Sequence, residues 1–89
     1  MSEPVDVMRK RLYMRSIRRG IKEMDLILKA FADAHLADLD GEQLTQYDQL
    51  LSESDHDLYQ WVSGQSVGPD AYGPMLEMIR KGAVGVTRP

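Results

Sequence analysis

Residues 24–35 read Met-Asp-Leu-Ile-Leu-Lys-Ala-Phe-Ala-Asp-Ala-His, and this stretch decides the fold class. Its apolar side chains recur every three or four residues, which is the spacing of one face of an α-helix. The residues on that face are Met24, Ile27, Leu28, Phe31 and His35. We expect Leu26, Ala30 and Ala34 to widen the face, which would make this helix the most buried one.

The sequence on either side predicts two neighbouring helices. Before residue 24, the pattern predicts a helix from Val7 to about Arg19, with Asp6 as its N-cap. Gly20 is expected to end that helix in the left-handed conformation that glycine adopts easily. After residue 35, Asp40 and Gln43 resemble a capping box that opens a third helix. The side chains expected to point inward from this helix are Leu44, Tyr47, Leu50 and Leu51.

The last third of the chain predicts two more helices around a turn-rich segment. Ser54 is expected to open a fourth helix that ends at Gly64, with Leu58, Trp61 and Val62 on its inner face. Residues 64–74 contain three glycines and two prolines and should form a loop. A fifth helix is expected from Pro74 to Lys81, attached through Met75 or Leu76 and Ile79.

No stretch alternates between apolar and polar residues as a strand does, so the sequence predicts an all-α protein, a compact bundle of five short helices. Its 89 residues suffice for a single helical domain over residues 1–89. We expect an ordered core at about residues 6–81 and a flexible tail at residues 83–89.

Composition excludes several classes of protein. Because the chain has no cysteine, it forms no disulfide, no thiolate nucleophile and no cysteine zinc site. Its longest apolar run is far shorter than the roughly 20 residues that span a bilayer, so we expect no direct membrane insertion. No apolar stretch follows the basic N-terminal residues, and we expect no secretory signal. These features favour a cytoplasmic protein.

The sequence contains no recognisable catalytic or metal-binding constellation. His35 and His56 stand 21 residues apart, without further histidines or cysteines at metal-ligand spacing. The glycines of residues 64–73 match neither the P-loop nor the dinucleotide-binding spacing. We therefore expect no enzyme activity, no metal site and no bound cofactor.

Charge is distributed unevenly along the chain. Residues 9–22 hold seven basic side chains and no acid, whereas residues 33–57 hold eight acids and no lysine or arginine. A basic helix could contact phosphates, but the sequence pI of about 5.2 argues against nucleic-acid binding. We expect instead a dipolar surface that steers a protein partner.

The segment Arg18-Arg19-Gly20-Ile21-Lys22-Glu23-Met24-Asp25 places charges of both signs around a glycine between two helices. It has two interpretations. In the structural one, Gly20 caps the second helix and Glu23 folds back to the cap N–H, as in a capping box. In the functional one, the same residues face outward and bind a partner. The residues alone leave both open.

The sequence Arg19-Gly20-x-x-Glu23, followed by Met-Asp, resembles the RGxxE signature of the succinate dehydrogenase assembly factor family, the small flavinylation factors of bacteria and mitochondria. The resemblance continues through residues 26–32 to Tyr47 and Leu50-Leu51, and to Asp57-Leu58-Tyr59-x-Trp61. It covers roughly residues 8–64. Two positions depart from the family pattern: His56 stands where proline is frequent, and Ile17 where an aromatic residue is frequent.

The resemblance implies a five-helix bundle that binds the flavoprotein subunit of succinate dehydrogenase, or of fumarate reductase. It implies promotion of covalent FAD attachment to that subunit, in a bond that the flavoprotein forms itself. The factor would bind no cofactor stably, act as a monomer and reside in the bacterial cytoplasm. The residues expected to bind the partner are Arg19, Gly20 and Glu23, with Arg18, Lys22 and Asp25 at the rim. The alternative is an antitoxin-like module in which the same surface neutralises a toxin.

Overall fold

Residues 3–17 and 19–83, which the computed structural model describes, form α-helices and short 3₁₀ turns without any strand. The elements are α1 (Val5–Ile17), α2 (Lys22–His35), η1 (Leu36–Asp38), α3 (Gly41–Leu51), α4 (Asp55–Val62), η2 (Asp70–Tyr72) and α5 (Gly73–Ala83). The predicted all-α bundle of five short helices is confirmed. Most of the expected flexible tail, residues 84–89, lies outside the described residues.

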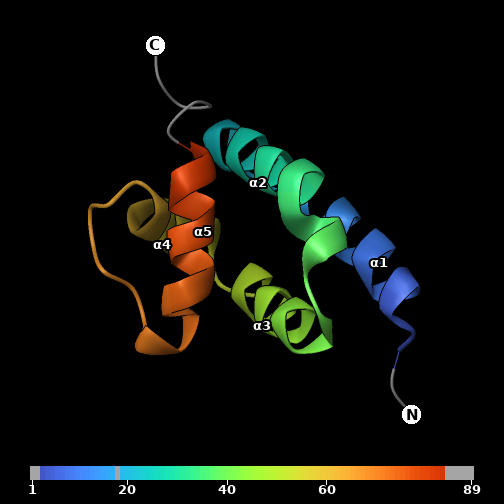
Figure 1. Cartoon of the computed structure of the whole chain (residues 1–89). Helices are drawn as coiled ribbons and strands as arrows, with labels where there is room; N and C mark the ends of the chain where they lie inside the picture. Colours follow the sequence, from blue (N-terminus) through green and yellow to red (C-terminus); the bar gives the residue numbers. More distant parts are fainter. Residues whose placement is uncertain (1–2, 18, 84–89) are drawn as a thin grey trace.

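The helices pack around α2. α1 and α2 form an antiparallel pair, α5 packs against both α2 and α4, and α3 closes the bundle beneath α1 and α5 (Figure 1). The expected inner face of α2 is confirmed, since Met24, Ile27, Leu28 and Phe31 are all buried. The expected widening is wrong at Leu26, which is 47% exposed, and at Ala34, which is also exposed. The buried arc of α2 instead includes Ala32.

The core extends beyond the residues that periodicity singled out. Leu36 in η1 and Leu39 just after it are buried, and both lie in the short connection between α2 and α3. The Phe31 and Tyr47 rings meet with centroids 5.2 Å apart. The buried apolar side chains are Leu12, Met24, Ile27, Leu28, Phe31, Ala32, Leu36, Leu39, Leu44, Tyr47, Leu50, Leu51, Leu58, Val62, Met75, Leu76 and Ile79.

Two helix starts follow the predicted capping chemistry. The Asp40 carboxylate accepts from the Gln43 N–H at 2.8 Å, while the Gln43 side chain accepts from the Asp40 N–H at 3.0 Å. This reciprocal pair is the predicted capping box of α3. At α4, the Ser54 hydroxyl accepts from the Asp57 N–H at 3.2 Å. Because these bonds satisfy donors that a helix start leaves free, both boundaries could be located from sequence.

The boundaries of α1 and α2 differ from the prediction. α1 begins at Val5, so Asp6 lies in its first turn and is not its N-cap. Gly20 does not adopt the left-handed conformation; within the described chain, only Gly64 and Gly68 have positive φ. The N-cap of α2 is Ile21, which makes no side-chain cap bond. This finding overturns the capping-box interpretation, in which Gly20 is the cap and Glu23 folds back to it.

One buried polar contact joins α1 to α3. Ser16 and Tyr47 are both 0% exposed, and their hydroxyl oxygens lie 2.6 Å apart. Because the Ser16 hydroxyl donates to the Leu12 carbonyl at 2.7 Å, the phenol must donate to Ser16. Burial of the phenol raises the pKa of Tyr47 to about 12. The pair therefore fixes how α1 sits on α3 without leaving a buried hydroxyl unsatisfied.

Candidate functional site

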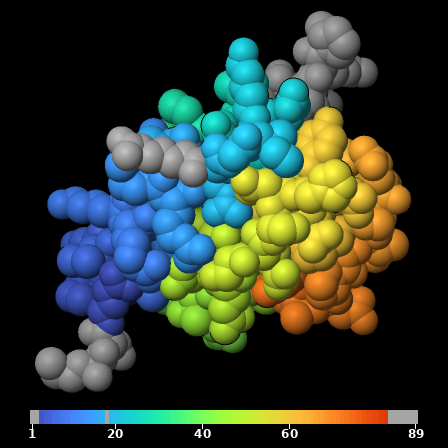
Figure 2. Space-filling view, turned by 180° about the vertical axis from the view of Figure 1, so that it is seen from behind, coloured from blue at the N-terminus to red at the C-terminus, as the bar shows by residue number. Residues whose placement is uncertain are grey.

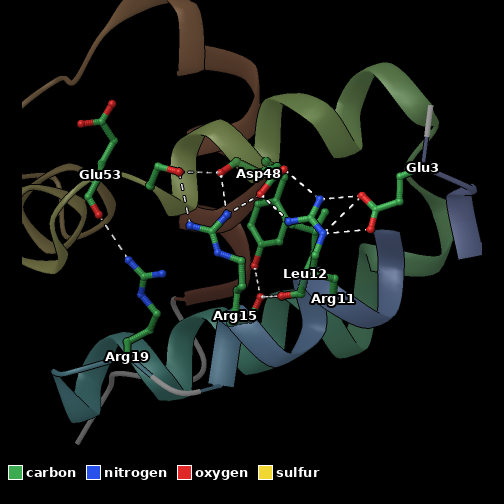
Figure 3. A network of polar contacts seen from close by, with 10 residues as sticks. Glu3, Arg11, Leu12, Arg15, Arg19, Asp48 and Glu53 are labelled. Carbon is green, nitrogen blue, oxygen red and sulfur yellow. Dashed lines mark hydrogen bonds and ion pairs between the residues drawn. The ribbon is translucent and has the colours of Figure 1, made fainter. Parts of the chain in front are cut away.

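Several arginines of residues 9–22 form ion pairs with acidic side chains of the same chain. The Arg11 guanidinium donates to the Glu3 carboxylate at 2.8–3.2 Å and to the Asp48 carboxylate at 2.9 and 3.0 Å. Arg15 bonds to the same Asp48 carboxylate and donates to its backbone carbonyl at 3.2 Å (Figure 3). The hydrogen bonds from Arg11 hold the pKa of Asp48 below its usual value. At these positions the expected dipolar surface is wrong, because the opposite charges of α1 and α3 neutralise each other.

The chain turns from α1 into α2 at residues 19–25, which we call the elbow. The Arg19 side chain is only 11% exposed, and its Nε lies 2.6 Å from Asp55 Oδ1. Its Nη2 donates to the Glu53 carbonyl at 3.2 Å, while the Glu53 carboxylate points away (Figure 3). Most of the guanidinium is thus held by the connection between α3 and α4 and by the first residue of α4.

The backbone of the elbow is held by two carboxylates. The Arg19 N–H donates to Asp25 Oδ1 at 2.6 Å, and the Gly20 N–H donates to Asp55 Oδ2 at 2.8 Å. Asp55 therefore uses one oxygen for the Arg19 guanidinium and the other for the Gly20 amide. Since carboxylates are strong acceptors for N–H groups, this arrangement fixes the path of the chain between α1 and α2.

Among residues 3–17 and 19–83, nothing requires glycine at position 20. Its φ is not positive, so the backbone imposes no glycine-only conformation. A Cβ built on Gly20 would lie 3.4 Å from Asp55 Oδ2, which is an ordinary van der Waals separation. Gly20 is also exposed. The described residues therefore give no reason for a glycine at this position.

The outer side of the elbow carries charged side chains. Lys22 and Glu23, both in the first turn of α2, are exposed, whereas Asp25 is half-buried. Glu23 makes no hydrogen bond or ion pair with the residues that the structure describes. The start of α2 projects from the surface beside the start of α4 (Figure 2). The sixth expected site residue, Arg18, lies outside the described part of the chain.

The structure thus divides the expected site residues into two groups. Arg19 and Asp25 act inside the elbow, while Gly20, Lys22 and Glu23 face solvent. The sequence does not identify Asp55 and Glu53 as partners of Arg19, because they lie 36 and 34 residues away from it and no local spacing links them.

A second surface feature lies near the other end of the α1–α2 pair. It is an open hollow of about 620 Å³ lined mainly by apolar atoms of both helices, and its lining includes Tyr13, Met14 and Leu36. It shares no lining residue with the elbow. Elsewhere in the described chain, no three histidine, aspartate or glutamate side chains gather as a metal site would require. None of the described helices is long and apolar enough to cross a membrane.

Comparison with known proteins places the elbow inside the segment that a family model matches. The model described as "Flavinator of succinate dehydrogenase" matches residues 10–83. A Drosophila yakuba protein named succinate dehydrogenase assembly factor 2-A, mitochondrial, is 38% identical over 93 residues, covering 98% of this chain and 57% of its own length. Assembly factor 2 proteins of Aspergillus terreus and Saccharomyces cerevisiae, both named mitochondrial, are 48% and 45% identical over 61 and 62 residues. They cover 68% and 70% of this chain, and 21% and 38% of their own lengths.

The chain therefore spans between about a fifth and somewhat more than half of these three relatives. Their names also correct one expectation. The predicted bacterial, cytoplasmic location is wrong by this comparison, because all three relatives are named as mitochondrial proteins and come from eukaryotes.

Proposed function

Because the chain belongs to the family of succinate dehydrogenase flavinators, whose model covers residues 10–83, we propose that it binds the flavoprotein subunit of succinate dehydrogenase. In this proposal it promotes the covalent attachment of FAD to that subunit, which we call the client. The flavoprotein subunit of fumarate reductase is a second client of the same kind. The chain acts as a monomer, catalyses no step itself and holds no FAD stably, since the flavin stays on the client.

The observation that supports this proposal is the exposed elbow with a glycine that the fold does not need. A Cβ at position 20 fits against the described residues but would stand between the elbow backbone and a docked protein. Glu23, exposed one residue after the start of α2, is available to pair with a cation of the client. In this proposal Gly20, Lys22 and Glu23 touch the client, and Arg19 and Asp25 shape the elbow from within.

A binding protein of this kind acts by shifting a population. If it binds the flavinylation-competent conformer of the client more tightly than other conformers, it multiplies the ratio of that conformer to the others by up to the ratio of the two affinities. Each difference of about 1.4 kcal/mol in binding free energy changes this ratio of conformers by about tenfold. In this proposal no catalytic side chain on the factor is needed.

The two competing interpretations are less well supported. Nucleic-acid binding requires basic side chains free for phosphates, yet Arg11, Arg15 and Arg19 bond to carboxylates of the same chain. The antitoxin-like alternative receives no support from the Drosophila, Aspergillus and Saccharomyces relatives, which are all named as assembly factors.

The proposal is tested by deleting the gene for this chain and measuring covalent flavin on the flavoprotein subunit by in-gel fluorescence after denaturation. We expect the covalent flavin signal to be lost or strongly reduced, and to return when the parent chain is expressed again. Undiminished covalent flavin in the deletion strain would contradict the proposed function.

Substitutions with matched controls separate docking from folding. Gly20→Ala and the bulkier Gly20→Arg should reduce covalent flavin, whereas Gly41→Ala should not. Gly41 is likewise exposed and has open space around its Cβ position. Glu23→Ala should also reduce covalent flavin, while Glu42→Ala, which removes the same exposed acid from the first turn of α3, should not. Thermal unfolding by circular dichroism verifies that each variant folds.

A further inference from the structure

Asp55 connects two parts of the chain that are far apart in sequence. It is the first residue of α4, and its two carboxylate oxygens accept from Arg19 Nε at 2.6 Å and from the Gly20 N–H at 2.8 Å. Its side chain is 21% exposed, so these bonds are partly shielded from water. The Glu53 carbonyl, two residues earlier, accepts a third hydrogen bond from the elbow, donated by Arg19 Nη2. The start of α4 is therefore the anchor to which the elbow is attached.

We propose that Asp55 is a positioning residue for client binding: it holds Arg19 and Gly20 against α4, so that Gly20, Lys22 and Glu23 are presented to the client in one arrangement. This inference rests on the proposed function and adds to it a residue outside the RGxxE signature. Asp55 does not touch the client; it acts through the backbone of the elbow.

The need for positioning follows from the chemistry of the elbow. Glycine has more backbone conformations available than any other residue, so an unrestrained Gly20 would sample several paths between α1 and α2. A client that recognises one of these paths binds with an apparent Kd raised by the inverse of that path's population. The bonds that Asp55 accepts from both Arg19 and Gly20 hold the chain in one path and so avoid this loss of affinity.

Replacement of Asp55 by asparagine should release the elbow. The asparagine side chain has one oxygen and one NH2 group, so it cannot accept from both the Gly20 N–H and Arg19 Nε, and its neutral oxygen is a weaker acceptor for either of them than a carboxylate. It also removes the negative charge opposite the guanidinium. Asp48→Asn is the matched control, since Asp48 likewise bonds to arginines of α1 but lies on α3 and makes no hydrogen bond or ion pair with the described residues of the elbow.

The first measurement needs no client. Hydrogen exchange of the Gly20 amide, followed by NMR, should be about tenfold faster or more in Asp55→Asn, as expected when a bond to a charged acceptor is lost. In Asp48→Asn the Gly20 amide should exchange as in the parent chain. Unchanged protection of Gly20 in Asp55→Asn would overturn the inference.

The second measurement is the affinity for the purified flavoprotein subunit of succinate dehydrogenase, at a temperature where circular dichroism shows all variants folded. We expect Asp55→Asn to bind about tenfold more weakly, which corresponds to about 1.4 kcal/mol, and Asp48→Asn to bind as the parent does. Parent-like affinity of Asp55→Asn, or equal weakening by both substitutions, would overturn the inference. If the parent chain itself does not bind the flavoprotein, the proposed function fails, while the exchange measurement still decides whether Asp55 holds the elbow.

Discussion

Ser16→Ala is expected to destabilise the protein more than Tyr47→Phe, although each substitution removes one hydroxyl from the same hydrogen bond. The reason is the direction of donation: the phenol donates to Ser16, and Ser16 donates onward to the Leu12 carbonyl. Ser16→Ala leaves the 0%-exposed phenol without an acceptor, which costs about 1–3 kcal/mol. Tyr47→Phe leaves Ser16 bonded to Leu12 and removes only one net hydrogen bond, worth about 1 kcal/mol.

The double variant makes the test sharper. With both hydroxyls gone, no buried donor is left unsatisfied, so Ser16→Ala/Tyr47→Phe should be more stable than Ser16→Ala alone. Urea unfolding measures these stability differences from the shift in the midpoint urea concentration, provided that the m-value is the same in all variants. In thermal unfolding, each kcal/mol corresponds to roughly 4–8 °C in Tm for a domain of this size. The reasoning is refuted if the double variant is less stable than Ser16→Ala, because the phenol would then have an acceptor other than Ser16.

Two further predictions concern an ion pair and a loop. Because Arg11 lowers the folded-state pKa of Asp48, the stability it confers is full above the unfolded-state pKa of about 3.9 and is lost as pH falls through the folded-state pKa. Asp48→Asn should therefore lower the free energy of unfolding at pH 7 by about 1 kcal/mol, because the ion pairs are partly exposed to water. It should also flatten the decline of that free energy below about pH 4, which urea midpoints across that range would show; an unchanged decline would contradict this. Gly68→Ala should cost more stability than Gly64→Ala in thermal melts. Both glycines have positive φ, but only at Gly68 would the Cβ lie 2.9 Å from Leu76 and 3.0 Å from Trp61. Equal losses would mean that the loop moves away without cost.

Features encoded locally in the sequence were predicted well. The inner face of α2 follows from a single helical period, and the starts of α3 and α4 follow from Asp40 and Ser54, whose side chains cap the N–H groups a few residues later. Gly64 has a positive φ just after α4, where the sequence predicted the helix to end. In each case the residues that determine the structure lie within one or two turns of one another.

Features that depend on distant partners were not predicted. Gly20 was expected to end a helix through its own conformation, but the elbow is shaped by Asp55, 35 residues away. The arginines of residues 9–22 were expected to form a basic surface. Three of them instead bond to Asp48 and Asp55, and the sequence does not reveal that these two acids lie opposite them. Leu26 was assigned to the core by its apolar character, although its position on α2 faces solvent.

The attachment of α1 has a consequence for how the molecule opens. α1 buries only Leu12 and Ser16 fully, and it is held to α3 by the Ser16–Tyr47 hydrogen bond and by the ion pairs of Arg11 and Arg15 with Asp48. Partly exposed ion pairs weaken as ionic strength rises, whereas apolar packing does not depend on this screening. Added sodium chloride should therefore loosen α1 first, while the packing among α2, α4 and α5 persists. The elbow, which joins this salt-sensitive helix to the rest of the bundle, lies at the boundary between the two regions.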